Sequence, residues 1–474
     1  MNIKSKEFRK NAHQFVDWMA DYMDNVEGYP VKSQVLPKEI YNQIEDNIPN
    51  QGEDIETIFN DFKKIIMPGI THWQSPNFFA YFPANTSPPS ILAEMLTATL
   101  GVQGMKWETS PASTELEERM TEWFKDAIGI PPNWTGVIQD SASSATLASI
   151  LTAREQKTHY KINQAGFKGF TNFRVYCSEE THSSIEKGAK IAGIGKENVI
   201  KIPTDDILRL RPDLLLQTIQ QDIKNGYQPL CIIAAIGTTG TTAIDPLNDI
   251  AKIAEEFKIW LHIDAAYAGS VLLLPEYQNF IKGIEKADSF VFNPNKWLFT
   301  NFDSSIYFVK NKNALVHTFE ILPEYLKTNT DGMVSNHCDW GIPLGRRFRS
   351  LKLWFVMRYY GLDELQNKLR YHIELAKWFE NKIVKSSDFK LVVPRNINLV
   401  CFHFKPQKLS DIKELNGINE ELLHKLNKTG IIYLTHTKVN GIYTLRMVIG
   451  QTNVNQNHIE KAWELISNTA MTIV

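Results

Sequence analysis

The first apolar residues of the chain recur every three or four positions, which predicts amphipathic helices. One helix is expected over about residues 8–23, and the sequence around Pro30 interrupts it. A second helix is expected over 55–66, with a similar apolar stripe. These helices have little apolar sequence of their own to pack against. We therefore expect an N-terminal arm that packs on the main body of the protein or on a second subunit.

From about residue 110 the pattern changes to short apolar runs that alternate with helical segments. Ser110 followed by Pro111 is typical of a helix start. The apolar runs that we interpret as buried strands are 136–139, 174–178, 198–203, 229–236, 259–264 and 289–293. Continuous apolar strands separated by helices are typical of a mostly parallel sheet with helices on both faces. The expected fold class is therefore α/β.

The last part of the chain has a different pattern. Runs at 399–404, 431–437 and 443–449 alternate as partly exposed strands do, and helices are expected near 418–428 and 455–468. We expect three parts: an N-terminal helical arm over 1–85, a large α/β domain over 86–362, and a small C-terminal α+β domain over 363–474.

Composition narrows the class of protein without identifying it. The 474 residues are 43% hydrophobic and carry a formal net charge of −2, which is ordinary for a globular protein and gives no reason to expect a nucleic-acid partner. The N-terminus lacks an apolar signal core, and no long apolar run predicts a membrane span. Four widely spaced cysteines without a CxxC pair favour reduced thiols over disulfides or a metal site. A soluble, cytoplasmic protein is expected.

Lys296 is the first candidate for chemistry. It follows the apolar run 289–292 and the turn sequence Asn293-Pro294-Asn295, and apolar residues continue after it. Loss of solvent around the amine would lower its pKa toward neutrality and make it a nucleophile able to form a Schiff base. For a lone lysine, the alternative that its ammonium group reaches water is the better interpretation.

Other polar residues follow the other predicted strands, where ligands collect in open parallel sheets. Ser141, Ala142 and Ser143 begin a predicted helix and could hold a phosphate through backbone amides and hydroxyl groups. The residues after the remaining strands are His182, Thr239, Asp264 with Ala266, and Asn293. Each could be a simple turn or helix-capping residue. Their order at successive strand ends, with Lys296 last, favours a site for pyridoxal 5′-phosphate, which needs an amine, a carboxylate at the ring nitrogen and a phosphate seat.

Several segments carry a resemblance to a known family. They include THWQSPNFFAYFP, SPASTELE, GVIQDSAS, HIDAAYAGS, FNPNKW and IPLGRRFRSLKLWFV. Together they resemble the group II pyridoxal-phosphate-dependent decarboxylases over nearly the whole chain, and most closely the aromatic L-amino-acid decarboxylases. The resemblance implies a fold-type I enzyme, similar to aspartate aminotransferase, and a homodimer with active sites between subunits. It also implies that the N-terminal arm exchanges across the dimer.

The resemblance also implies roles for individual residues. Lys296 matches the Schiff-base lysine, Asp264 the partner of the pyridinium nitrogen, and His182 the histidine that stacks on the ring near the substrate carboxylate. The residues that match cofactor-binding positions are Ser141, Ala142, Ser143, Thr239, Ala266, Ser289 and Asn293. Those that match the substrate pocket are Trp73, Tyr81, Phe82, Pro83, Ala84, Met105, His182 and Gly345. Tyr325, in the segment 321–336 that matches a mobile loop, corresponds to the acid that protonates the substrate carbon.

Some residues depart from the family pattern. Asn295 stands where the animal enzyme has histidine, Ala84 replaces a threonine, and Gln103 and Met105 also differ. Gly345 leaves space under the substrate ring, which favours a large aromatic substrate, although glycine could simply suit the backbone.

The expected function is decarboxylation of an aromatic L-amino acid to its amine, with tryptophan, 5-hydroxytryptophan, phenylalanine, tyrosine and dopa as the candidate substrates. The alternatives are an aromatic aldehyde synthase, a histidine decarboxylase, or an inactive homologue that acts as a binding protein.

Overall fold

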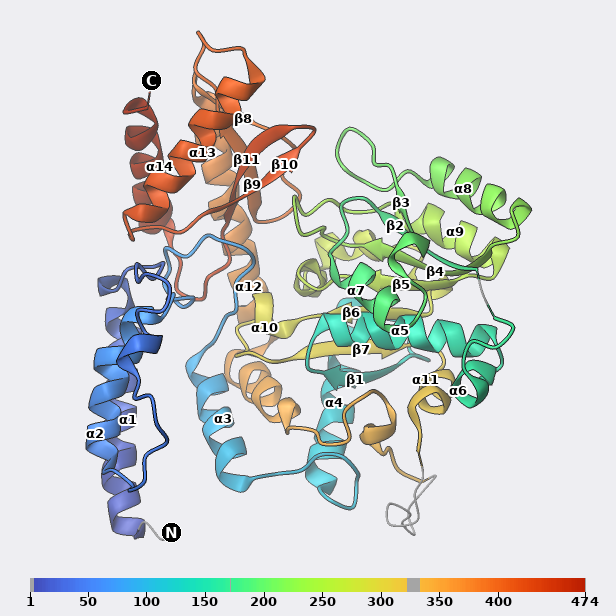
Figure 1. Cartoon of the computed structure of the whole chain (residues 1–474), viewed down its shortest axis with the longest axis horizontal. Helices are drawn as coiled ribbons and strands as arrows, with labels where there is room; N and C mark the ends of the chain where they lie inside the picture. Colours follow the sequence, from blue (N-terminus) through green and yellow to red (C-terminus); the bar gives the residue numbers. More distant parts are fainter. Residues whose placement is uncertain (1–3, 171, 322–332, 474) are drawn as a thin grey trace. The chain divides into compact units, whose positions relative to one another are not determined.

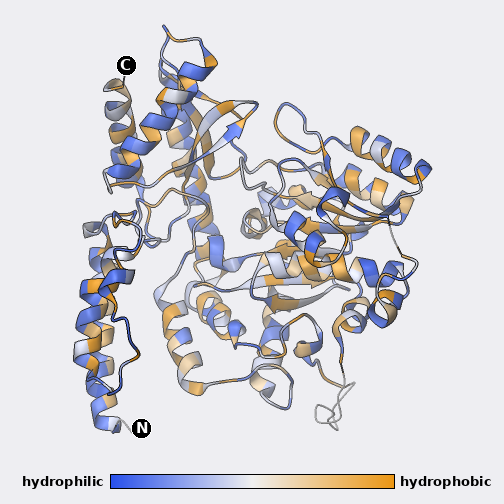
Figure 2. Cartoon of the chain, viewed as in Figure 1, coloured by the Kyte–Doolittle hydropathy of each residue, from blue (hydrophilic) through white to orange (hydrophobic). Residues whose placement is uncertain are grey.

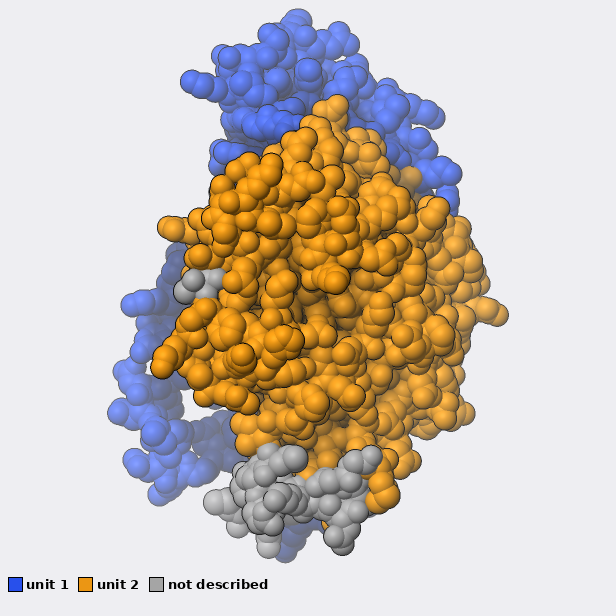
Figure 3. All heavy atoms as spheres, turned by 90° about the vertical axis from the view of Figure 1, so that its right-hand side faces the viewer, with its two compact units in different colours: residues 1–83, 374–392, 400–474 blue, residues 84–373, 393–399 orange. Residues whose placement is uncertain are grey.

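The computed structural model describes residues 4–170, 172–321 and 333–473. Two compact units make up the chain (Figure 3). The first contains Met1–Pro83, Glu374–Val392 and Val400–Val474, and the second contains Ala84–Ile373 and Val393–Leu399. The predicted division into three parts, with boundaries at residues 85 and 362, stays a prediction.

The second unit contains a seven-stranded sheet with the order β1-β7-β6-β5-β4-β2-β3 (Figure 1). Its strands are β1 (Thr135–Gln139), β2 (Phe173–Ser178), β3 (Val199–Ile202), β4 (Gln228–Ala235), β5 (Trp260–Asp264), β6 (Ser289–Phe292) and β7 (Ser305–Val309). Neighbours from β6 to β3 run parallel, and β7 is antiparallel to both β1 and β6. The predicted mostly parallel sheet is confirmed, and β7 is a strand that the sequence pattern did not predict.

Helices cover both faces of this sheet. The helices of this unit are α3 (Pro88–Leu100), α4 (Pro111–Ile128), α5 (Ala142–Lys157), α6 (Lys161–Ala165), α7 (Ser184–Ile191), α8 (Pro212–Lys224), α9 (Leu247–Phe257), α10 (Pro294–Trp297) and α11 (Lys312–Phe319). Helix α5 packs along β1 and β4 to β7 with α7 beside it, and α8 and α9 pack together against β4 from the other side (Figure 1). The strands between them are largely hydrophobic (Figure 2). Burial on both faces explains why they read as continuous apolar runs.

The first unit contains a four-stranded sheet with the order β10-β11-β9-β8. Its strands are β8 (Phe389–Leu391), β9 (Leu399–Phe404), β10 (Thr435–Val439) and β11 (Ile442–Val448), with helices α13 (Ile412–Lys428) and α14 (Gln456–Met471). The prediction of a strand over 431–437 is wrong for its first half, because β10 begins at Thr435. The prediction of alternating exposure is wrong for β9, whose six residues are all buried. Helix α12 (Arg349–Lys385) runs through the residues of both units and has non-helical backbone angles at Gly361.

The predicted N-terminal helices are present as α1 (Ser5–Asn25) and α2 (Ile55–Asp61), the second followed by a π-helical turn over Phe62–Ile66. They contact each other through aromatic rings, with the centroids of Phe15 and Phe59 4.4 Å apart. Even so, α1 has no buried residue. Within the described part of the chain, no helix is long and apolar enough to cross a membrane.

Candidate active site

The parallel strands of the large sheet bring most of the predicted cofactor residues to one edge. Strands β1, β2, β4, β5 and β6 all end there, separated only by the antiparallel β7 between β1 and β6. Apart from Ser289, which begins β6, each predicted cofactor residue lies at the end of one of these strands or follows that end within a few positions. Ligands bind at this edge in open parallel sheets. The edge is therefore the candidate active site.

Lys296 lies in a short turn after β6, which we call the lysine turn (Asn293–Trp297). The N–H of Asn293 donates to the carbonyl of Ala266 at 3.1 Å, and the N–H of Lys296 donates to the carbonyl of Asn293 at 3.0 Å. The buried Asn85 adds two further bonds: its N–H donates to the carbonyl of Asn295 at 3.0 Å, and its Nδ2 donates to the carbonyl of Lys296 at 3.1 Å. These bonds fix the backbone from which the amine projects. Nothing in the sequence pattern pointed to Asn85.

The side of the lysine turn that faces the protein interior is packed by aromatic rings. Trp297 is fully buried and stacks on Tyr267 with ring centroids 5.3 Å apart. Its Nε1 donates to Nδ1 of His372 at 3.0 Å. Asn295, the residue that departs from the family pattern, is also buried, and its Oδ1 accepts the N–H of Ser304 at 3.1 Å. Asn295 therefore fastens the turn to the start of β7.

The carboxylate of Asp264 lies close enough to Lys296 to influence the pKa of its amine. Burial lowers the pKa of the Lys296 amine below its ordinary value, and the negative charge of Asp264 opposes that shift. Asp264 ends β5, and its Oδ1 accepts the N–H of Ala266 at 3.0 Å. Lys296 and Asp264 therefore match the expected arrangement, a desolvated amine near a carboxylate that is held by a backbone hydrogen bond.

His182 belongs to the same group of charges. Burial lowers its pKa, Asp264 raises it and Lys296 lowers it further, so the three side chains act on one another electrostatically. The Nδ1 atom of His182 lies 3.1 Å from the N–H of Ser184, which can only donate. A neutral ring therefore carries its proton on Nε2. Lys296, Asp264 and His182, predicted from three separate strand ends, are brought together by the fold.

The residues predicted to hold a phosphate lie at the start of α5. Ser141 caps the helix, with its Oγ accepting the N–H of Ser144 at 3.2 Å. Ser143 in the first turn is exposed. The first backbone N–H groups of a helix lack partners within the helix and carry partial positive charge, which suits a phosphate dianion.

Thr239 and Ser289 lie in different surroundings. Thr239 follows β4 and is exposed. Gly237, two residues before it, has a φ of +90°, and a Cβ atom added there would lie only 2.6 Å from the Cβ of Ala268. A side chain at Gly237 would thus disturb this edge.

Ser289 is the first residue of β6, so the length of the strand places it about 10 Å from the end at which the lysine turn begins. It is fully buried, and its Oγ contacts Ser149 at 2.9 Å and Nδ1 of His262 at 2.9 Å. Ser289 thus lies at the start of β6, away from the edge at which the strand ends, and its role in cofactor binding stays a prediction.

These residues fit pyridoxal 5′-phosphate. The Oδ1 atom of Asn293 is buried and has no hydrogen-bond partner within the described ranges, so it can accept a donor from a bound group. The amine, the carboxylate and the helix N-terminus match the aldehyde, ring nitrogen and phosphate of the cofactor. No cluster of metal-binding side chains occurs among the residues described.

The predicted substrate residues fall into both units. In the first unit, Trp73 stacks on Tyr81 with centroids 5.8 Å apart, and Tyr81 Oη lies 3.3 Å from Tyr433 Oη. Phe82 and Pro83 are buried beside them in sequence. In the second unit Ala84, Met105 and Gly345 are found, and Tyr325 lies outside the described residues.

The space expected at Gly345 is not empty. A Cβ atom added there would lie 3.2 Å from Nε2 of Gln103. The expectation that this glycine leaves room for a large ring stays a prediction, and the carboxamide of Gln103 is the group that lies next to it.

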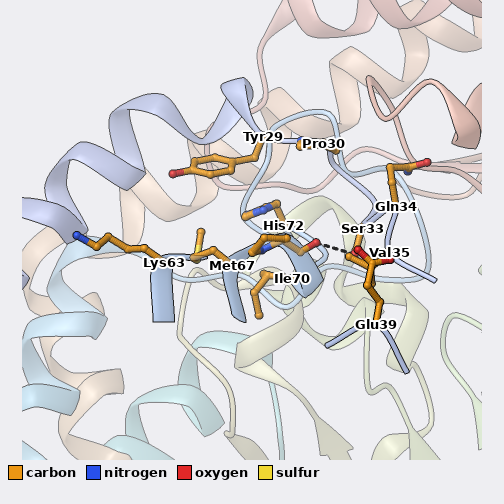
Figure 4. A pocket seen from close by; sticks show the side chains of 11 residues that line it. Tyr29, Pro30, Ser33, Gln34, Val35, Glu39, Lys63, Met67, Ile70 and His72 are labelled. Carbon is orange, nitrogen blue, oxygen red and sulfur yellow. Dashed lines mark hydrogen bonds between the residues drawn. The ribbon is translucent and has the colours of Figure 1, made fainter. Parts of the chain in front are cut away.

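A cavity of about 400 Å³ lies in the first unit, in the N-terminal segment (Figure 4). Tyr29, Pro30, Lys63, Met67 and His72 are among its lining residues, and Ser33 Oγ donates to the carbonyl of Pro68 at 2.9 Å. None of the predicted site residues lines it.

Comparison with known proteins assigns a family to this arrangement. Residues 37–405 match the family described as the pyridoxal-dependent decarboxylase conserved domain. The chain is 42% identical to a phenylacetaldehyde synthase of Petunia hybrida, over 99% of this chain and 95% of that protein. It is 40% identical to tyrosine decarboxylase 3 of Petroselinum crispum, over 99% and 92% of the two chains. The crystal structure of Catharanthus roseus tryptophan decarboxylase in complex with L-tryptophan matches with a TM-score of 0.94, 39% identity and full coverage of both chains.

Proposed function

The chain belongs to the pyridoxal-dependent decarboxylase family, and we propose that it decarboxylates an aromatic L-amino acid to the corresponding amine and carbon dioxide. The observation that carries the proposal is the meeting of Lys296, Asp264 and His182 at the strand ends of a fold whose similar proteins act on aromatic amino acids. The cofactor is pyridoxal 5′-phosphate.

When bound, the cofactor supplies an electron-withdrawing ring that accepts the electron pair released as carbon dioxide leaves. Lys296 would hold the aldehyde end, and the lowered pKa of its amine keeps a larger fraction of it neutral and nucleophilic. Asp264 would hold the ring nitrogen in its protonated form. The N-terminus of α5 with Ser141, Ala142 and Ser143 would bind the phosphate, together with Thr239 and Asn293.

Orientation of the substrate falls to His182 and to the pocket residues. The Nε2–H of His182 points away from the bond at Nδ1 and is placed to hydrogen-bond a carboxylate. Holding the bond to the departing carboxylate in a reactive direction is an orientation effect, which can lower barriers by about 7–11 kcal/mol. Tyr325 would donate a proton to the substrate carbon after carbon dioxide has left, a role that rests on the resemblance alone.

The proposal includes a homodimer in the cytoplasm. The exposed apolar residues of the arm support a partner subunit: Phe8 is 62% exposed and Leu36 is 72% exposed. The four cysteines are free and buried, as is typical of proteins in a reducing compartment.

A product assay tests the proposed function. The purified protein, loaded with pyridoxal 5′-phosphate, is incubated separately with tryptophan, phenylalanine, tyrosine, dopa and histidine. Carbon dioxide and the matching amine from an aromatic substrate are expected. Turnover of histidine alone, or no carbon dioxide from any substrate, would contradict the proposal.

A second outcome at the same site is an oxidative one, in which dioxygen and water are consumed and the aldehyde, carbon dioxide, ammonia and hydrogen peroxide form in place of the amine. The similarity to a phenylacetaldehyde synthase of Petunia hybrida favours considering it. Tyr325 favours the amine, because related aldehyde synthases carry phenylalanine at the matching position. Aldehyde, ammonia and peroxide in the same assay would identify the aldehyde synthase.

A further inference from the structure

Gln103 and Gly345, which we call the ring-end pair, lie in contact although they are more than 240 positions apart in sequence. The position of a Cβ on Gly345 would be 3.2 Å from Nε2 of Gln103 and 3.8 Å from its Oε1. The nitrogen of the carboxamide is thus the atom nearer to Gly345. Both residues are exposed to solvent.

The orientation of this carboxamide follows from its neighbour Arg346. The backbone N–H of Arg346 donates to Oε1 of Gln103 at 2.7 Å. A backbone N–H can only donate, so the atom that faces it must be the oxygen, and the NH2 group must point the other way. The Gln103 side chain therefore presents a donor toward Gly345.

Arg346 is itself firmly anchored. Its guanidinium Nη2 lies 2.7 Å from Oε1 of Glu117 and donates to the carbonyl of Ile138 at 2.7 Å, and both charged side chains are buried. The N–H of Gly104 donates to the carbonyl of Arg346 at 2.9 Å. Ile138 belongs to β1, which ends just before the phosphate seat at the start of α5. The ring-end pair is thus tied through buried contacts to the strand that positions the cofactor.

We propose that Gln103 is a specificity-determining residue whose NH2 group donates a hydrogen bond to an oxygen on the ring of the substrate. This inference rests on the proposed function and on Gly345 as part of the substrate pocket. A ring hydroxyl, as in tyrosine or 5-hydroxytryptophan, offers the required acceptor. Phenylalanine has no polar atom on its ring, and the indole N–H of tryptophan is a donor, so neither can accept this bond.

Two matched substrate pairs isolate the effect of the hydroxyl. Tyrosine differs from phenylalanine, and 5-hydroxytryptophan from tryptophan, by one ring oxygen. A single neutral hydrogen bond of ordinary net strength favours the hydroxylated member by about 3–10-fold in kcat/KM. With phenylalanine or tryptophan bound, the NH2 group of Gln103 would lack an acceptor, which also favours the hydroxylated substrate of each pair.

The test measures kcat/KM for all four amino acids with the full-length enzyme loaded with pyridoxal 5′-phosphate. Gln103→Leu keeps the size of the side chain and removes the donor, so both ratios should fall to about one while turnover of phenylalanine is retained. Gln103→Ala also opens the space beside Gly345, so turnover of tryptophan should rise. Gln221→Leu is the matched control, because Gln221 is exposed on α8 and its Nε2 bonds Asn225 Oδ1 at 3.1 Å. It should leave both ratios unchanged.

The outcomes separate this inference from the proposed function. Amine formation from all four substrates, with ratios that Gln103→Leu does not change, would overturn the role of Gln103 and leave the decarboxylase intact. An absence of amine from every substrate would overturn both. A matching fall of all four kcat/KM values in both Gln103 variants would show a purely structural role and would also overturn the inference.

Discussion

The lysine turn and the ring-end pair are built in opposite ways. In the lysine turn the side chains around Lys296 are buried, and backbone hydrogen bonds from Ala266 and Asn85 hold the chain in place. In the ring-end pair an exposed carboxamide takes its direction from one hydrogen bond with Arg346. In the proposals made above, the chemistry is therefore assigned to groups whose replacement would disturb buried contacts. The selectivity is assigned to an exposed side chain that is held by one hydrogen bond.

The largest effect is expected at the lysine itself. Lys296→Ala removes the amine that holds the cofactor aldehyde, so decarboxylation should fall below detection and the absorbance of the lysine-bound cofactor should disappear. Lys310→Ala, at an exposed lysine after β7, should change neither property. Full turnover by Lys296→Ala would show that the lysine turn is not the reactive part of the site.

Replacing Asp264 by Asn should have the next largest effect. Loss of one fixed charge at the reacting group costs about 10²–10³-fold in kcat, by analogy with other electrostatic groups of active sites. Because Asp264 opposes the lowering of the Lys296 pKa by burial, its removal should lower that pKa further. In the cofactor-free protein, the pH at which the Lys296 amine becomes reactive toward an acylating reagent should therefore move down. A shift toward higher pH would contradict the assignment of this pair.

Tyr325→Phe tests the residue that is proposed to protonate the substrate carbon. Without the hydroxyl, formation of amine should fall by about 10²-fold or more, the usual contribution of a positioned proton donor, and aldehyde should become the main product. Amine and aldehyde are quantified together by chromatography. Tyr359→Phe, at a tyrosine that is 72% exposed, serves as control and should keep the product ratio of the wild type. An unchanged amine yield in Tyr325→Phe would remove the proposed role.

The smallest expected effect concerns the support of the lysine turn. Asn85→Ala leaves the partly buried carbonyl of Lys296 without the bond from Nδ2, which should lower the free energy of unfolding by about 1–3 kcal/mol. Urea unfolding of the full chain measures this. Asn25→Ala removes an exposed side-chain bond to the carbonyl of Asp21 and should cost less than about 0.5 kcal/mol. Equal effects of the two variants would show that the turn does not depend on Asn85.

The parts of the fold that sequence could predict are those with a local signal. Buried strands such as β4 read as apolar runs, and Ser110 before Pro111 marked the start of α4, where Ser110 Oγ accepts the N–H of Ser113. Strand β7 was missed because the apolar run 305–309 follows the lysine turn without a helical segment between them. Its antiparallel pairing with β1 and β6 arises from contacts distant in sequence.

In the candidate site, too, the residues with a local sequence signal could be predicted and the others could not. Lys296, Asp264 and His182 could be predicted because each follows a strand and matches a motif. Ser289 matched a motif too, but its place at the far end of β6 buries it against Ser149 and His262. Asn85 and the contact of Gln103 with Gly345 could not be predicted, because they join segments about 200 residues apart or more and have no local pattern.

The most direct test of the central claim is to locate the lysine that binds the cofactor. The protein loaded with pyridoxal 5′-phosphate is reduced with borohydride, digested, and analysed by mass spectrometry. One pyridoxyl group per chain, on the peptide that contains Lys296, is the predicted result. Labelling of a different lysine, or no label on a protein that still forms amine, would contradict it.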